Sequence, residues 1–151
     1  IFDKPSGIMV HPISKHTKYS LLDEIRYHFG DNANLAHRID LETSGLVLIT
    51  KNKYADVKIK AMIENRQFFK KYLALVNGKI DKKITINTPI AKDSGQIKIK
   101  MKVDKNGKPS ITIVEPLKYY QTTKQTLIQA TILTGRQHQI RVHLFHVKHP
   151  I

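Results

Sequence analysis

The sequence predicts an α+β fold, in which strands joined by tight turns outnumber the helices beside them. Three observations support this class. Short apolar runs have strand-like composition or alternate with polar residues, Asn-Gly turns interrupt them, and helical spacing of apolar residues is confined to three stretches. The 151 residues contain no internal repeat, low-complexity tract or interdomain linker, so we expect a single domain over residues 1–151.

Each predicted element follows from a local pattern. The first two strands are expected to pair as a hairpin around the turn Lys4-Pro5-Ser6-Gly7, and the first helix has Ser20 and Asp23 at the spacing of a capping box. The apolar face of that helix consists of Leu21, Leu22, Ile25 and Phe29. The predicted strands cover residues 1–3, 8–10, 46–50, 68–76, 97–103, 110–120 and 126–133, and the predicted helices cover residues 20–30, 53–65 and 134–147.

The charge of the chain favours a polyanionic partner. The chain contains 26 Lys and Arg residues and 12 Asp and Glu residues, which gives a net charge of +14. A field of this size indicates RNA or DNA, and a row formed by Lys98, Lys100 and Lys102 is either a set of phosphate contacts or a solvated hairpin face. A membrane is disfavoured, because no apolar run approaches the roughly 20 residues of a spanning helix. The absence of Cys fits a cytoplasmic protein.

The segment His37-Arg38-Ile39-Asp40-Leu41-Glu42-Thr43-Ser44-Gly45 precedes the apolar run Leu46-Val47-Leu48-Ile49. This pattern places a carboxylate, flanked by cationic side chains, on a polar loop that enters a buried strand. Catalytic groups are often found on such loops. Asp also caps turns frequently, so the segment alone leaves Asp40 either catalytic or structural.

The segment Gly135-Arg136-Gln137-His138-Gln139-Ile140-Arg141-Val142-His143-Leu144 is the second informative stretch. On the predicted helix, Gln137 and Arg141 share a face, and an Arg held in this way can bind a carboxylate or a phosphate through two hydrogen bonds. The alternative is an ordinary amphipathic helix with a solvated polar side. Four histidines near the end of the chain lack the spacing of a zinc site, so no metal site is predicted.

Both segments closely resemble motifs of the RluA-like pseudouridine synthases. Two weaker matches are Lys70-Lys71-Tyr72-Leu73-Ala74-Leu75-Val76, which contains the Lys-x-Tyr pattern of the family, and residues 3–12. The four stretches occur in the family's order and span nearly the whole chain. The resemblance implies the family's catalytic fold, with a mixed, mostly antiparallel sheet, flanking helices and a central RNA-binding cleft. It also implies an isomerase that converts uridine to pseudouridine in rRNA or tRNA, and we expect a domain cut at both ends.

The resemblance also implies roles for individual residues. Asp40 is expected to be the essential catalytic residue, Arg141 to pair with Asp40, and Tyr72 to stack on the flipped base. The expected RNA contacts are Arg38, His37, Lys70, Arg136, His138 and Gln139. No cofactor is required, and we expect a monomer. The alternatives are a non-catalytic RNA-binding module with the same basic cleft, which has no use for a lone carboxylate, and a metal-dependent RNA hydrolase.

Overall fold

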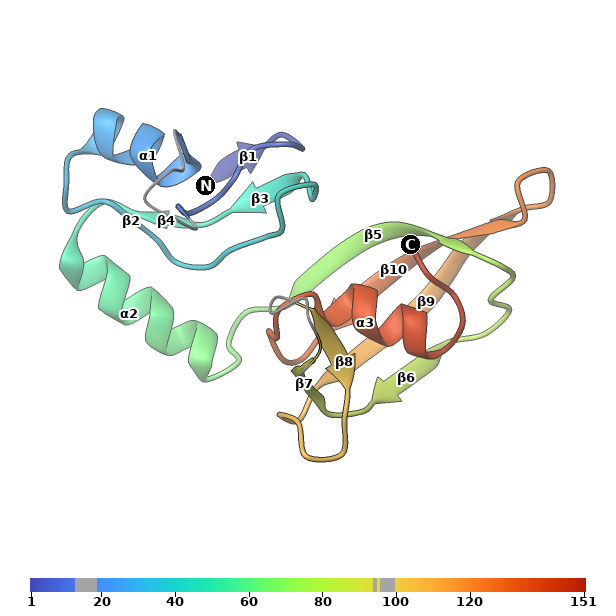
Figure 1. Ribbon diagram of the computed structural model, residues 1–151. Coiled ribbons are helices and arrows are strands. Elements are labelled where there is room, and N and C mark those ends of the chain that lie inside the picture. Colours follow the sequence, from blue (N-terminus) through green and yellow to red (C-terminus); the bar gives the residue numbers. More distant parts are fainter. Residues whose placement is uncertain (13–18, 94, 96–99) are drawn as a thin grey trace. The chain divides into compact units, whose positions relative to one another are not determined.

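The computed structural model describes residues 1–12, 19–93, 95 and 100–151, and its internal contacts divide them into two compact units. Unit 1 comprises residues Ile1–Gln67 and unit 2 comprises residues Phe68–Ile151. Every strand pair in the described part of the chain is antiparallel, and three helices accompany the strands. The predicted α+β class is therefore confirmed (Figure 1).

Unit 1 combines two short strand pairs with two helices (Figure 1). Its elements are β1 (Phe2–Lys4), α1 (Leu21–Phe29), β2 (Asn34–Leu35), β3 (Gly45–Val47), β4 (Ile49–Thr50) and α2 (Lys53–Glu64). Strand β1 pairs with β3, and β2 pairs with β4. The expected hairpin between residues 1–3 and 8–10 is wrong, because the partner of β1 lies about forty residues further along the chain and residues 8–10 are not a strand.

Helix α1 begins and ends as predicted. The carboxylate of Asp23 accepts hydrogen bonds from the backbone N–H and the hydroxyl of Ser20, at 2.9 and 2.7 Å. Gly30 ends the helix with a positive φ of 84°, a conformation that costs glycine little. Leu21, Leu22 and Ile25 are buried in the core of the unit with Val47 and others. Phe29 is 41% exposed, so its predicted place on the apolar face is wrong.

Helix α2 starts at the predicted position because the side chain of Asn52 accepts a hydrogen bond from the N–H of Ala55 at 2.9 Å. None of its residues is fully buried. The strand predicted over residues 46–50 is divided at Leu48 into β3 and β4, which pair with different strands. Residues 45–50 therefore pair with two different strands, β1 and β2.

Unit 2 is built on a four-stranded sheet in the order β5-β10-β9-β6, with helix α3 packed on one face (Figure 1). Its elements are β5 (Lys70–Asn77), β6 (Ile84–Asn87), β7 (Ile90–Lys92), β8 (Met101–Val103), β9 (Ile111–Tyr120), β10 (Gln125–Ile132) and α3 (Gln139–His146). The buried residues alternate along β10, and Leu144 of α3 completes the core against them. Strands β7 and β8 form a separate pair.

Two predictions for unit 2 require correction. Helix α3 begins at Gln139, not at residue 134, because His138 adopts a left-handed conformation with φ of 53°. Gln137 therefore precedes the helix, and the predicted face shared with Arg141 does not exist. Of the strand predicted over 97–103, only β8 is described, and residues 97–99, which include Lys98, lie outside the described residues. Lys102 is 3.6 Å from a carboxylate oxygen of Asp93, so the lysine row is partly neutralised.

Candidate active site

Asp40 lies on the loop of residues 36–44, between β2 and β3. The base of this loop is closed by the pairing of β2 with β4 and by a hydrogen bond of 2.9 Å from the N–H of Ala36 to the carbonyl of Leu48. The N–H of Thr43 donates to the carbonyl of Asp40 at 3.1 Å, which forms a turn directly after the carboxylate. Asp40 is half-buried and Arg38 is exposed. The loop therefore holds its backbone in a defined shape at the position of the predicted catalytic residue.

Lys4, the last residue of β1, also holds this loop in place. Its side chain is fully buried, and its ammonium donates to the carbonyls of Pro5, Ile8 and Leu41 at 2.8, 2.9 and 3.0 Å. The N–H of Gly7 also donates to Leu41, at 2.9 Å. The turn after β1 is thus bound to the residue that follows Asp40. Three carbonyl acceptors compensate much of the cost of burying the charge of Lys4.

The ammonium of Lys4 also interacts electrostatically with Asp40. Burial lowers the pKa of Lys4 below its ordinary value, and the negative charge of Asp40 acts in the opposite direction. From the sequence, Arg141 is predicted as the cation that interacts with Asp40. Lys4 is assigned only to a turn. The signal that points to Lys4 is its position in the match over residues 3–12.

His37 is tied to the same strand region. Its Nε2 accepts a hydrogen bond of 3.1 Å from the N–H of Leu48, so one ring nitrogen is engaged with the backbone between β3 and β4. The predicted contact of His37 with RNA therefore requires ring atoms other than Nε2. Arg38, which is exposed, has the freedom that the predicted RNA contact requires.

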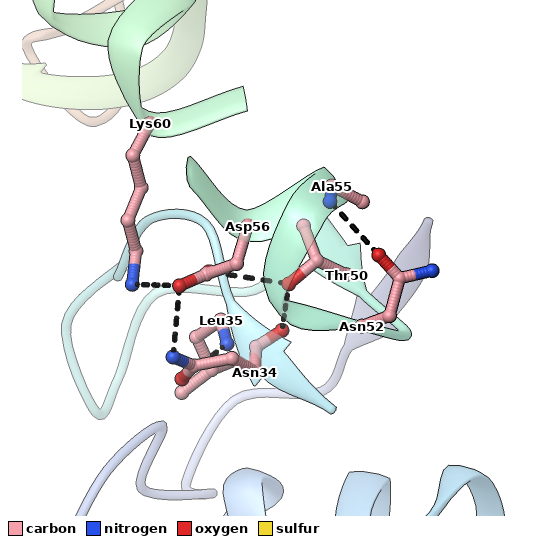
Figure 2. Close-up of polar contacts among 7 residues, drawn as sticks. All are labelled: Asn34, Leu35, Thr50, Asn52, Ala55, Asp56 and Lys60. Atoms are coloured by element: carbon pink, nitrogen blue, oxygen red, sulfur yellow. Dashed lines mark hydrogen bonds and ion pairs between the residues drawn. The ribbon is translucent and has the colours of Figure 1, made fainter. Parts of the chain in front are cut away.

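The carboxylate of Asp56 on α2 joins both strands at the base of the loop (Figure 2). It accepts hydrogen bonds from the amide of Asn34 and the hydroxyl of Thr50, both at 3.2 Å, and forms an ion pair of 2.7 Å with Lys60. Burial raises the pKa of Asp56, but Lys60, Thr50 and Asn34 outweigh burial and hold it below its ordinary value. Because Asn34 and Thr50 are partners in the β2–β4 pair, α2 supports the strands that carry the Asp40 loop.

In unit 2, Lys70 and Tyr72 lie on one face of β5. Tyr72 is opposite Ala130 and Lys70 is opposite Ile132, so both point to the face on which α3 packs. The Nζ of Lys70 would be 3.1 Å from a Cβ atom at Gly135, and burial lowers the pKa of Lys70. The structure therefore brings the Lys-x-Tyr match next to the first residue of the 135–144 motif.

Gln139 is part of a buried network and is not available to RNA as predicted. Its exposed fraction is 3%, and its side-chain oxygen accepts from the hydroxyl of Thr134 and the N–H of Arg136 at 2.8 and 3.0 Å. Its amide nitrogen donates to the carbonyl of Ile111 and to the hydroxyl of Thr112 at 2.9 and 3.0 Å. This geometry supports a structural role for Gln139 and removes it from our set of RNA contacts.

His143 completes this network beneath α3. It is fully buried, with Nδ1 at 2.8 Å from the hydroxyl of Thr112 and Nε2 at 3.0 Å from the carbonyl of Thr88. Burial lowers the pKa of His143, although the carbonyl of Thr88 opposes that shift. A neutral ring that donates through Nε2 satisfies both contacts. These two contacts give His143 a role in packing α3 against the rest of unit 2.

Three further predicted site residues of unit 2 are at least partly exposed. Arg141 is exposed on α3, while Arg136 and His138 are half-buried before the helix. The Nε of Arg136 donates to the carbonyl of Pro109 at 3.3 Å, which leaves the other guanidinium nitrogens for a ligand. Arg136 and His138 are therefore accessible to RNA, while the pairing of Arg141 with Asp40 stays a prediction.

The described residues contain neither a candidate metal cluster nor a candidate membrane span. Among residues 1–12, 19–93, 95 and 100–151, no group of three or more His, Cys, Asp or Glu side chains is arranged to hold a metal ion. In the same part of the chain, no helix is long and apolar enough to span a membrane.

This chain is similar to known proteins in both sequence and structure. The human protein "RNA Pseudouridylate Synthase Domain Containing 1" matches 98% of this chain with a TM-score of 0.81 and 28% identity, and the match covers 61% of that chain. The fold is therefore that of a pseudouridylate synthase domain. The sequence model of the family "RNA pseudouridylate synthase" matches residues 1–146. The chain belongs to this RNA pseudouridylate synthase family.

Curated relatives extend the comparison. An "Uncharacterized RNA pseudouridine synthase" of Helicobacter pylori strain J99 is 46% identical over 154 residues, which cover 100% of this chain and 53% of the relative. "Ribosomal large subunit pseudouridine synthase D" of Pseudomonas aeruginosa is 35% identical over 156 residues, which cover 100% of this chain and 48% of the relative. Relatives with the latter name support the predicted RluA-like family. The chain spans about half the length of these relatives.

Proposed function

We propose that this protein converts uridine to pseudouridine within RNA, with Asp40 as the catalytic residue. The observation that carries the proposal is the family match over residues 1–146, which includes the motif around Asp40. The reaction breaks the bond between N1 of uracil and C1′ of ribose and forms a bond between C5 and C1′. The proton lost from C5 is balanced by a proton gained at N1, so no oxidant, reductant or cofactor is consumed.

A single ionised carboxylate suits this chemistry because it can attack as a nucleophile or remove a proton, and then leave. Both routes, at the base and at the ribose, require a carboxylate held in place. The three hydrogen bonds of Lys4 and the pairing at the base of the loop supply such positioning. A uridine within a stack must be flipped out to be reached, and the exposed Arg38 is suited to occupy the resulting gap.

The rest of the proposal rests on relatives and on charge. Relatives named for the large ribosomal subunit make rRNA our proposed substrate class, and the net charge of +14 favours such a polyanion. We propose that both units form one catalytic domain, that Tyr72 and Arg141 act as predicted, and that Arg38, His37, Lys70, Arg136 and His138 contact RNA. We also propose that the protein acts as a monomer in the cytoplasm.

The test is the release of tritium from transcripts of large-subunit rRNA labelled at C5 of uridine, because the new bond to C5 displaces that hydrogen. Asp40→Asn should lower the rate by about a thousandfold, since the amide can neither attack nor accept a proton, while RNA affinity stays nearly unchanged. Glu42→Gln, which removes an exposed carboxylate two residues away, should keep the rate. Full activity of Asp40→Asn would refute the catalytic assignment, and tight binding without turnover by the native protein would favour the RNA-binding module.

A further inference from the structure

Unit 1 exposes two aromatic rings that each lie beneath a lysine ammonium. The Nζ of Lys51 is 4.9 Å from the ring centroid of Phe29, and the Nζ of Lys58 is 5.1 Å from that of Tyr54. Phe29 is 41% exposed and Tyr54 is 73% exposed. Lys51 lies three residues before Tyr54 at the start of α2, so its contact with Phe29 links the end of α1 to that helix. We call these four residues the aromatic–lysine surface.

The packing of unit 1 does not account for these rings. Phe29 has the sequence spacing of the apolar face of α1, yet it lies outside the core in which Leu21, Leu22 and Ile25 are buried. Tyr54 is on α2, none of whose residues is buried. Large exposed aromatic rings that the core does not use are typical of binding surfaces.

The carboxylates on the two helices leave the positive charge of this surface largely intact. The carboxylate of Asp56 is engaged by Asn34, Thr50 and Lys60 (Figure 2). Glu24 on α1 pairs with His28 at 2.9 Å. Asp31, after α1, is an exposed acid nearby in sequence, and Lys51, Lys53 and Lys58 outnumber it. The surface therefore offers stacking faces together with excess cations.

We propose that the aromatic–lysine surface binds unpaired nucleotides of the RNA that flank the target uridine. This inference rests on the proposed action on RNA and adds a second contact region on unit 1, distinct from the Asp40 loop. Unpaired bases stack on aromatic rings, and lysines pair with the phosphates between them. A base that stacks on Tyr54 takes the place of the Lys58 ammonium, which then pairs with the phosphate of the same nucleotide. In an RNA duplex the bases are paired and stacked on one another, so a duplex can make only the lysine–phosphate contacts with this surface.

The first experiment measures binding of a fluorescein-labelled oligouridylate of about 12 nucleotides by fluorescence anisotropy, using the whole protein. Tyr54→Ala and Phe29→Ala should each weaken binding about tenfold, since stacking on one ring contributes roughly that factor. Tyr54→Phe keeps the ring and should bind like the native protein. Binding of a blunt RNA duplex of equal length should not change in any of these variants.

A matched control exists in unit 2, where the Nζ of Lys118 is 5.0 Å from the ring centroid of Tyr120, which is 38% exposed. Tyr120→Ala should leave oligouridylate affinity unchanged if the surface on unit 1 is specific. Lys51→Gln and Lys58→Gln should each make the dependence of log K on log salt shallower by about 0.7, the value for one phosphate contact on a single strand.

Several results would overturn the proposal. These are unchanged single-strand affinity in Tyr54→Ala, equal losses in Tyr120→Ala and Tyr54→Ala, or equal losses for duplex and single strand. A change in oligomeric state or in melting temperature without a change in RNA affinity would assign the surface to protein packing, and would also refute it. Binding is read without turnover, so these outcomes are separate from those of the Asp40→Asn test.

Discussion

The Asp40 loop in unit 1 and the 135–144 motif in unit 2 are the two most specific family signatures in the chain, and the fold uses them differently. The Asp40 loop is fixed by groups outside its own motif, chiefly Lys4 and the β2–β4 pair. The 135–144 motif instead supplies the anchoring side chains itself, because Gln139 and His143 of α3 extend into a buried hydrogen-bonded network with Thr112 of β9.

This difference shows that the residues of a family motif can have two kinds of role. Around Asp40, the supporting lysine lies more than thirty residues away in sequence, so the motif presents a group that other residues hold. In the 135–144 motif, buried polar residues support the start of α3 while Arg141 is exposed on the same helix. A match to a family motif therefore includes residues for which we propose contact with RNA together with residues that stabilise the local fold.

The largest effect is expected when the support of the Asp40 loop is removed. Lys4→Met removes three hydrogen bonds from a buried ammonium to the carbonyls of Pro5, Ile8 and Leu41, so the free energy of unfolding should fall by about 4 kcal/mol. Chemical denaturation measures this loss, and Lys53→Met, at an exposed lysine, is the control. Equal stability of the two variants would show that the buried ammonium contributes little to the loop.

The second prediction distinguishes buried from accessible residues within the 135–144 motif. Gln139→Leu should lower the free energy of unfolding by about 3 kcal/mol, because the hydroxyls, carbonyl and N–H that surround the amide lose their partners. The folded fraction should still bind RNA with native affinity. Arg136→Ala should show the opposite result, with stability nearly unchanged and weaker binding. If Gln139→Leu weakened binding without loss of stability, the original RNA-contact prediction would be restored.

The elements that the sequence predicted correctly are those whose causes are local. Helix α1 has its capping box at Ser20 and Asp23 and its terminal glycine at Gly30, and all three act within a few residues. Strands β9 and β10 are joined by a short turn and were predicted to within two residues. Local chemistry alone determines such boundaries.

The features that escaped prediction depend on distant partners. Strand β1 pairs with β3 because residues far apart in sequence share a core, which the turn at residues 4–7 does not reveal. Gln139 has the composition of a surface residue, and only the surrounding hydroxyls and carbonyls make its burial favourable. Among the candidate site residues, the sequence identified Asp40 by motif, but the role of Lys4 required the three carbonyls around it.

The smallest expected effect is a pH dependence that arises from His143. Burial lowers its pKa in the folded protein below the ordinary value of 6.5, so the unfolded chain binds the proton more readily. Stability should therefore be full above about pH 6.5 and decrease as the pH falls below that value, by less than the effect of Gln139→Leu. Denaturation between about pH 8 and pH 5.5 measures the slope. His143→Gln should lose part of this slope, whereas His11→Gln, at an exposed histidine, should retain it. Parallel pH profiles of His143→Gln and the native protein would show that the buried ring is not the titrating group, and would leave the network beneath α3 with a packing role that is insensitive to pH.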